Sequence, residues 1–275
     1  MGTEIREPKK LRLLVLTDYS PYGDAAVSHA AAISLVFRAE LIIIPLIDKE
    51  KTLGTEFTKA VEMLHKHNLP VVQYSQKLNL KKELYSFIEE HEVMMLVLAV
   101  SPKKQSYFSY RKALKLLKKM RVPVLVTGKA LPAQNAYQKI VLPLDYTIYA
   151  KEKSLWASYF GRFYKSEIHI LAKKYKDEYL RYKLHENVAY TEQLYDKLSI
   201  KYQLHRVTTT TENMDYYALD FAKQINATLI MSMTTKYLEL GDILTGTKEK
   251  KTIRNIDQIP YLYINQRDDL YVLCT

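Results

Sequence analysis

The chain carries one pattern twice, and this duplication constrains its fold more than any other feature. An apolar run closed by an aspartate ends at Asp18, and a similar run ends at Asp145. Each run precedes a helix-like stretch and then a second apolar run that opens with a glutamate, Glu40 or Glu167. The two aspartates stand 127 residues apart, close to the size of one ordinary domain. We therefore expect two similar domains, each of which could in principle build a core of its own.

The length of the chain agrees with two domains. Its 275 residues correspond to about two units at a typical domain size of roughly 150 residues. Seven glycines and nine prolines are few for this length, which argues against long flexible linkers. We place the first repeat at 9–128 and the second repeat at 137–275, with a short linker between them.

Strand-like and helix-like stretches alternate in both repeats, which predicts an α/β fold with parallel strands and right-handed crossovers. Several of the strands are continuous apolar runs, as expected where helices cover both faces of a sheet. The expected strands are 11–16, 41–45, 71–74, 94–100 and 122–126, then 139–144, 168–172, 202–208, 228–233 and 261–264. The expected helices are 24–37, 55–67, 81–91 and 110–120, then 150–163, 178–198, 214–225 and 247–255. A further edge strand is expected at 270–274.

The chain is basic, with 41 Lys and Arg against 30 Asp and Glu and a net charge of +11. Part of the excess clusters at 112–121 and 248–254. Leucines interleave with the first cluster, as on the solvated face of an amphipathic helix, and no RNA-binding, zinc-finger or recognition-helix motif accompanies the charge. The charge alone therefore does not predict nucleic-acid binding. A basic nucleic-acid-associated protein is kept as an alternative function.

The compartment is predicted from cysteine and apolar content. The single cysteine, Cys274, cannot form an internal disulfide, so nothing marks an oxidising compartment. The N-terminus shows no signal-like apolar segment, and no apolar run reaches the roughly 18 residues that span a bilayer. We expect a cytoplasmic protein without a membrane partner.

The repeated aspartates are the most specific polar feature. In a doubly wound sheet, ligands bind outside the carboxyl ends of the strands, where Asp18 and Asp145 are expected to lie. An aspartate in this place can also cap the turn that follows it. Position alone leaves both roles open.

Together these features resemble the universal stress protein family. The shared features are a strand closing on aspartate, a helix, a strand with glutamate near its start, and a last helix that leads into a strand near a proline, Pro123 or Pro260. The resemblance covers nearly the whole chain as a tandem pair. It implies a doubly wound, five-stranded parallel sheet of order 3-2-1-4-5 in each repeat, of the Rossmann-like kind. It also implies that the repeats pack as an intramolecular pseudo-dimer, and we expect them to meet through their fifth strands.

Many members of that family bind ATP or AMP, with the aspartate after strand one at the adenine and a loop of form G-x-x-G-x9-G-[ST] at the ribose and phosphates. The second repeat keeps the end of this loop as Gly246 and Thr247, followed by Lys248, but has Met233 and Lys236 where the leading glycines belong. The first repeat has no glycine in the corresponding segment. The resemblance implies at most one weak adenine-nucleotide site, in the second repeat.

The expected nucleotide-binding residues are therefore Asp145, Gly246, Thr247 and Lys248, with Asp18 as their counterpart in the first repeat. No metal site is expected, because the histidines do not stand at metal-ligand spacing. No catalytic signature is present, so we expect a stress-response binding or signalling module without turnover, with a protein partner or a second copy of the chain as its target. A slow ATPase or nucleotide-responsive switch is the alternative. Tyrosines 159, 164, 175, 179 and 182 are consistent with either an interface or ordinary helix packing.

Overall fold

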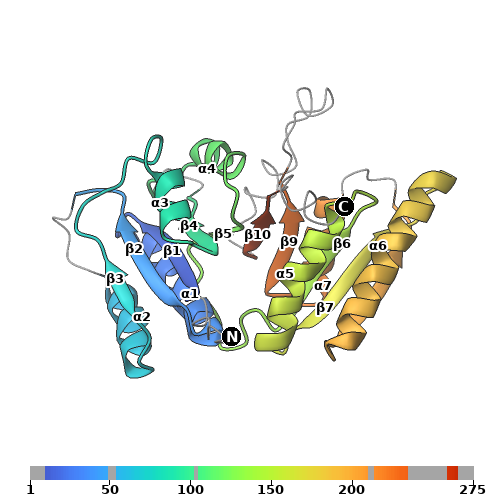
Figure 1. Ribbon diagram of the computed structural model, residues 1–275, viewed down its shortest axis with the longest axis horizontal. Coiled ribbons are helices and arrows are strands. Elements are labelled where there is room, and N and C mark those ends of the chain that lie inside the picture. The colour runs from blue at the N-terminus through green and yellow to red at the C-terminus, as the bar shows by residue number, and fades with distance from the viewer. Residues whose placement is uncertain (1–9, 49–53, 102–104, 210–213, 235–258, 266–275) are drawn as a thin grey trace, which may run out of the picture.

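The computed structural model describes residues 10–48, 54–101, 105–209, 214–234 and 259–265 (Figure 1). The helix expected at 247–255 and the edge strand expected at 270–274 lie outside these residues. So do Lys236, Gly246, Thr247 and Lys248.

Helices and strands alternate through both repeats, as the sequence predicts. The first repeat contains β1 (Arg12–Thr17), α1 (Pro21–Phe37), β2 (Glu40–Pro45), α2 (Thr55–Lys66), β3 (Val71–Gln73), α3 (Leu84–Glu90), β4 (Met95–Ala99), α4 (Tyr110–Leu117) and β5 (Val124–Thr127). The second contains β6 (Lys139–Leu144), α5 (Ala150–Phe163), β7 (Glu167–Lys173), α6 (Glu178–Lys197), β8 (Tyr202–Val207), α7 (Met214–Gln224), β9 (Leu229–Met233) and β10 (Tyr261–Ile264). The domain boundaries at 128 and 137 stay predictions.

The strands form one sheet of order β3-β2-β1-β4-β5-β10-β9-β6-β7-β8. Each half has the order 3-2-1-4-5, which confirms the predicted topology. The halves join where β10 pairs antiparallel with β5, in the register Tyr261 with Val126 and Tyr263 with Val124. Every other neighbouring pair is parallel. The fifth strands therefore meet as expected, and their pairing joins the two predicted sheets into one (Figure 1).

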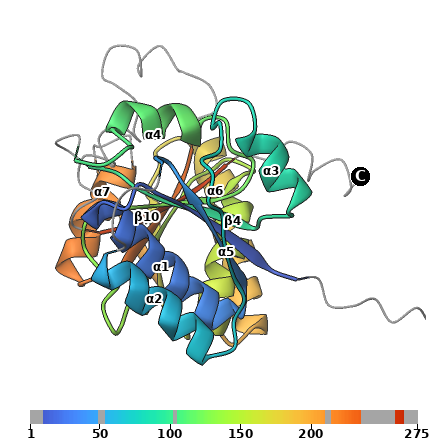
Figure 2. The same cartoon turned by 90° about the vertical axis from the view of Figure 1, so that its left-hand side faces the viewer.

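Helices cover both faces of the sheet (Figure 2). Helices α1, α2, α5 and α6 pack on the face to which Leu13 and Val15 of β1 contribute. Helices α3, α4 and α7 pack on the other face, with Leu14 and Leu16. Each of the two cores contains residues from both repeats, so the sheet and its covering layers are shared across the joint.

The repeated glutamates hold neighbouring strands together at their start. The Glu40 carboxylate lies 3.3 Å from Arg12 Nε, and the Arg12 guanidinium also donates to the His91 carbonyl at 3.0 Å. In the second repeat Glu167 lies 3.3 Å from Lys201 Nζ and accepts from the Gln203 amide at 2.7 Å. Their position far from the repeated aspartates gives them a structural role.

Helix α1 begins three residues earlier than the sequence pattern predicted. The Ser20 hydroxyl accepts a hydrogen bond from the Gly23 amide at 3.2 Å and caps the helix. Pro21 follows at the first helical position, where its missing N–H costs no hydrogen bond and its ring sets a helical φ. A serine cap followed by proline is a start signal that outweighs the apolar periodicity.

An aromatic cluster packs the two repeats against each other next to the pairing of β5 with β10. Phe37 of α1 meets Phe160 and Phe163 of α5, and Tyr164 directly after that helix, edge-on at ring distances of 5.6, 5.3 and 6.0 Å. The Tyr164 hydroxyl donates to the Ala32 carbonyl of α1 at 2.8 Å. Phe160 is fully buried. The cluster ties the first helix of one repeat to the first helix of the other.

A buried histidine completes this interface. His29 Nε2 lies 3.0 Å from the carbonyl of Ala130 in the linker, and its Nδ1 contacts the hydroxyl of the fully buried Tyr137. A carbonyl only accepts, so Nε2 carries the proton and Tyr137 donates to Nδ1. Burial lowers the pKa of His29 to about 4, so the ring is neutral at physiological pH.

Removing the Phe160 ring should destabilise both repeats at once. We expect Phe160→Ala to lower the free energy of unfolding by about 3–5 kcal/mol, because the cavity lies between packed helices. Urea unfolding followed by circular dichroism measures this loss. Phe163 touches the same Phe37 ring but is 46% exposed, so Phe163→Ala is the matched control and should cost far less. Equal losses in the two variants would contradict the account.

Stability should also fall below pH 6.5. Because His29 has a lower pKa in the folded chain than the ordinary value of about 6.5, the unfolded chain binds its proton more tightly. The contribution is complete above that pH and declines as the pH approaches 4, by on the order of 3 kcal/mol. Unfolding free energies measured from pH 7 to 4.5 should fall less steeply in His29→Gln. An identical pH dependence in both proteins would refute this role for His29.

Candidate functional site

The repeated aspartates lie where the sequence placed them, directly after β1 and β6. Strand β1 has β2 on one side and β4 on the other, and β6 lies between β7 and β9 in the same way. These are the switch points of the two half-sheets, outside which open α/β sheets bind ligands. We call the ends of the strands at Asp18 and Asp145 the carboxyl edge of each repeat. The two edges differ in how their aspartate is engaged.

In the first repeat the chain itself engages the aspartate. Asp18 Oδ1 accepts from the Ser20 amide at 3.1 Å and from the Ser20 hydroxyl at 2.6 Å. Asp18 Oδ2 accepts from the backbone amide of Tyr107, in the segment after β4. Residue 23 must be glycine here, since a Cβ would lie 2.6 Å from Asp18 Oδ1. The buried carboxylate thus caps a turn and holds the segment after β4.

The segment that contains Tyr107 is also held by the core. Phe108 is 2% exposed and packs with the core under α3 and α4. Its carbonyl accepts from the Ser101 amide at 3.2 Å. The Lys112 ammonium lies 4.2 Å from the centre of the Tyr107 ring. These contacts hold the Tyr107 amide against Asp18, where the resemblance would place a nucleotide.

The first carboxyl edge is also acidic. Asp24, on the first turn of α1, is buried, and burial together with the nearby charges of Asp18 and Glu56 raises the pKa of its carboxyl. Like charges that raise a pKa also repel an incoming anion. The first edge therefore disfavours a phosphate group.

In the second repeat the aspartate pairs with a buried lysine. Lys153 of α5 is 3% exposed, and its ammonium donates to Asp145 Oδ2 at 3.0 Å and to the Pro143 carbonyl at 2.6 Å. The amide of Thr147 donates to Asp145 Oδ1 at 2.9 Å, and so does its hydroxyl. Burial alone would raise the pKa of Asp145, but the Lys153 charge and the Thr147 hydrogen bonds hold it below its usual value. Asp145 is therefore ionised at neutral pH.

The turn after β6 is held in place by α6. The side-chain amide of Asn187, which is buried, donates to the Asp145 carbonyl at 2.9 Å and to the Thr147 carbonyl at 2.8 Å. The Asp145 side chain remains 29% exposed. A carboxylate has about four acceptor positions, so Asp145 has capacity for one further donor from a ligand.

The remaining predicted site residues cannot be placed beside Asp145, because Gly246, Thr247 and Lys248 lie outside the described residues. Met233 is the last residue of β9 and is 3% exposed. Its side chain belongs to the core on the α5 and α6 side of the sheet. Met233, which stands where the family loop has its first glycine, therefore packs in the core.

Two residues that sequence reasoning missed are His169 and His205. They come from neighbouring strands β7 and β8, and His169 Nδ1 lies 3.1 Å from His205 Nε2. Burial lowers the pKa of both rings, so the pair is neutral at physiological pH. Among the described residues, no group of three or more His, Cys, Asp and Glu is arranged to hold a metal ion. The contact depends on strand register, which residue spacing does not show.

Solved structures resemble this chain over almost its whole length. A universal stress protein from Archaeoglobus fulgidus matches with a TM-score of 0.67 and 15% identity, covering 94% of this chain and 97% of that one. A protein of unknown function from Pseudomonas aeruginosa matches with a TM-score of 0.65 and 14% identity, covering 95% of each chain. The cytoplasmic domain of a prokaryotic cation chloride cotransporter matches with a TM-score of 0.52 and 13% identity, covering 96% of this chain and 100% of that one.

No sequence-family model and no curated protein sequence matches the chain. The solved structures nevertheless show that the chain has the fold of universal stress proteins, and the resemblance found in the sequence is confirmed for the fold. In the described ranges, no helix has both the length and the apolar character needed to cross a membrane. Because proteins of different function share this fold, the site must carry the functional argument.

The pairing of Asp145 with Lys153 should be the most sensitive polar contact of the second edge. We expect Asp145→Asn to lower the free energy of unfolding by about 3–5 kcal/mol, because it leaves the Lys153 ammonium buried and unpaired. The double variant Asp145→Asn with Lys153→Met removes the stranded charge and should recover most of that loss. Chemical denaturation of the three proteins measures the coupling. Additive losses in the double variant would contradict a buried ion pair.

Proposed function

We propose that this chain is a stress-response binding or signalling module that holds at most one adenine nucleotide, ATP or AMP, at the carboxyl edge of its second repeat. Asp145, Gly246, Thr247 and Lys248 form the proposed site. Asp18, their counterpart, serves only the structure of the first repeat. The comparisons support the fold on which this proposal rests.

The observation that carries the proposal is a reversal of charge between matched positions. The two repeats align with a constant offset of 127 residues from β1 to β2 and from β6 to β7. Asp24 in the first repeat corresponds to Lys151 in the second, Ala25 to Glu152, and Ala26 to Lys153. These three matched positions therefore carry a net charge of −1 in the first repeat and +1 in the second. Anionic ligands favour the second edge on electrostatic grounds alone.

The accessibility of the two aspartates to a ligand also favours the second repeat. The Asp18 carboxylate is buried and accepts from the Tyr107 amide of its own chain. A ligand at the first edge would have to displace that amide and the anchored Phe108 segment. The Asp145 side chain is 29% exposed and keeps acceptor capacity. One site per chain follows from these two environments.

We propose a module without turnover. Phosphoryl transfer depends on positioned groups that stabilise charge and orient the attacking water. Lys153 is buried, and its ammonium already donates to Asp145 and to the Pro143 carbonyl, so it is not available to stabilise charge on a phosphate. A slow ATPase or nucleotide-responsive switch is the competing function, and turnover distinguishes it. A nucleic-acid-associated protein would show a steep fall of affinity with salt.

A protein partner or a second copy of the chain is proposed as the target of the module. Leu155, Tyr159 and Phe163 stand four residues apart on α5, and their exposed fractions are 42%, 42% and 46%. Residues spaced by four share one side of a helix, so they form an apolar stripe. Of the tyrosines noted in the sequence, Tyr164 packs against the core, whereas Tyr159 is exposed and belongs to this stripe.

Calorimetric titration with ATP should give one site per chain. We expect Thr247→Ala with Lys248→Ala to weaken binding at least tenfold, by removing a hydroxyl and a charge proposed to hold the phosphates. Asp18→Asn, in the first repeat, is the matched control and should leave the affinity unchanged. Asp145 is tested as Asp145→Ala within Lys153→Met, so that no charge is left buried. Two equivalent sites, or binding insensitive to residues 247 and 248, would refute the placement.

The same protein should not hydrolyse ATP above background. Phosphate release measured with magnesium over hours tests this. Turnover that is lost in Thr247→Ala would establish the ATPase in place of the binding module.

A further inference from the structure

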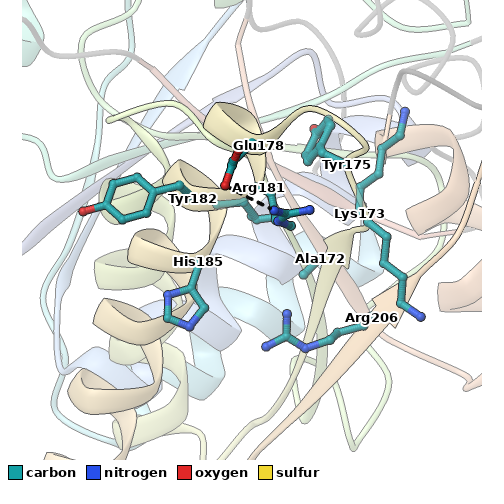
Figure 3. A pocket seen from close by; sticks show the side chains of 10 residues that line it. Ala172, Lys173, Tyr175, Glu178, Arg181, Tyr182, His185 and Arg206 are labelled. Atoms are coloured by element: carbon teal, nitrogen blue, oxygen red, sulfur yellow. Dashed lines mark ion pairs between the residues drawn. The ribbon is translucent and has the colours of Figure 1, made fainter.

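We propose that a cavity on the second repeat, bounded by α6, β7 and β8, binds a small phosphorylated anion. The described residues that line the cavity include none of the four proposed for the nucleotide site, and the proposal does not depend on a nucleotide binding there. The cavity has a volume of about 590 Å³ and opens above Ala172, at the carboxyl edge (Figure 3). Its lining residues are Ala172, Lys173, Lys174, Tyr175, Glu178, Arg181, Tyr182, Leu184, His185 and Arg206.

The lining is strongly basic. Four of these side chains carry a permanent positive charge, and one, Glu178, is a carboxylate. Arg181 and His185 from α6 and Arg206 from β8 gather around the space in front of Ala172, and Lys173 and Tyr175 border it (Figure 3). Such a concentration of like charge costs free energy unless an anion compensates it.

The arginines are available to a ligand. Arg181 lies 3.8 Å from Glu178, with both side chains largely exposed, so this ion pair contributes little and is easily exchanged. No carboxylate among the described residues pairs with Arg206. Two guanidinium groups from facing elements can grip one phosphate from two sides, each through paired N–H donors.

The cavity is built in part by two elements, α6 and β8, that are longer than their described counterparts α2 and β3 in the first repeat. Helices α2 and α6 both end five residues before the next strand begins, yet α2 has 12 residues and α6 has 20. The eight additional residues of α6, 178–185, include every residue that this helix gives to the cavity. Strand β8 has six residues where β3 has three, and Arg206 lies in the added part. Both extensions thus contribute to one site.

Two matched positions of the first repeat carry different chemistry. With the same offset of 127 residues, Lys173 corresponds to Leu46, and Tyr175 corresponds to Asp48. Leu46 is buried, and the Asp48 carboxylate pairs with Lys77 at 2.5 Å. The basic cavity is therefore an addition to the second repeat and not a property of the shared scaffold.

The shape indicates the class of ligand. A volume near 590 Å³ lies within the range of small-molecule sites and exceeds what a single inorganic phosphate fills. The ring of Tyr175 offers flat apolar surface and a hydroxyl group beside the cations, whereas the ring of Tyr182 points away from Ala172 (Figure 3). A small organic molecule with one phosphate or pyrophosphate group matches this combination. A nucleic acid would need a continuous basic track beyond the cavity.

Inorganic pyrophosphate tests the site, because it carries the charge shared by this class of ligand. Calorimetric titration of the full chain should show one pyrophosphate site. We expect Arg181→Ala with Arg206→Ala to weaken it at least tenfold, while circular dichroism and the unfolding midpoint stay unchanged. Lys115→Ala with Lys119→Ala removes the same charge from the first repeat and should change the affinity less than twofold.

The loop variant Thr247→Ala with Lys248→Ala separates this proposal from the proposed nucleotide site. Pyrophosphate binding that survives in the loop variant and is lost in the arginine variant supports the cavity, whether or not ATP binds elsewhere. Absence of binding up to about 10 mM pyrophosphate overturns the proposal. So does equal weakening in the lysine control, or a single-stranded oligonucleotide that binds through the same arginines more tightly than pyrophosphate.

Discussion

The antiparallel pairing of β5 with β10 is the interaction on which the rest of the structure depends. It satisfies the open edges of two half-sheets, which would otherwise expose unpaired backbone groups. It also brings α1 beside α5, so that Phe37 and Phe160 meet and Tyr164 reaches the backbone of α1. The neutral His29 adds a hydrogen bond from α1 to the Ala130 carbonyl in the linker. Two repeats that could each form a separate sheet become one body with shared cores.

Joining the repeats allows them to diverge. The first carboxyl edge is acidic and engaged by its own chain, since Asp18 accepts from the Tyr107 amide and lies near Asp24. In the second, Lys153 pairs with Asp145, Lys151 stands where the first repeat has Asp24, and the lengthened α6 adds arginine beside Lys173 and Arg206, so this edge is the more basic one. We propose that the first repeat serves as a scaffold and that the second carries the ligand sites. The same repeated aspartate serves both arrangements because a carboxylate can cap a turn and pair with a lysine.

Much of the fold could be predicted, because the apolar runs and the position of Asp18 and Asp145 are local signals that repeat. The topology followed from the resemblance, and the structure confirms it. The contacts of the sites could not be predicted in the same way. The bond from Tyr107 to Asp18 spans 89 residues, and the approach of His169 to His205 depends on the register of β7 and β8. The extension of α6 was visible as a long helix, but only the placement of Arg206 opposite it shows a cavity.

Hydrogen exchange at individual amides, with and without ATP, tests the central claim that the repeats have unequal roles. We expect the Tyr107 amide to be protected in the free protein, because it donates to a buried carboxylate, and we expect ATP to leave this protection unchanged. Amides near Asp145 should gain protection when ATP is added. A Tyr107 amide that exchanges freely, or that responds to ATP as strongly as the amides near Asp145, would show that the first edge is open and would contradict the account.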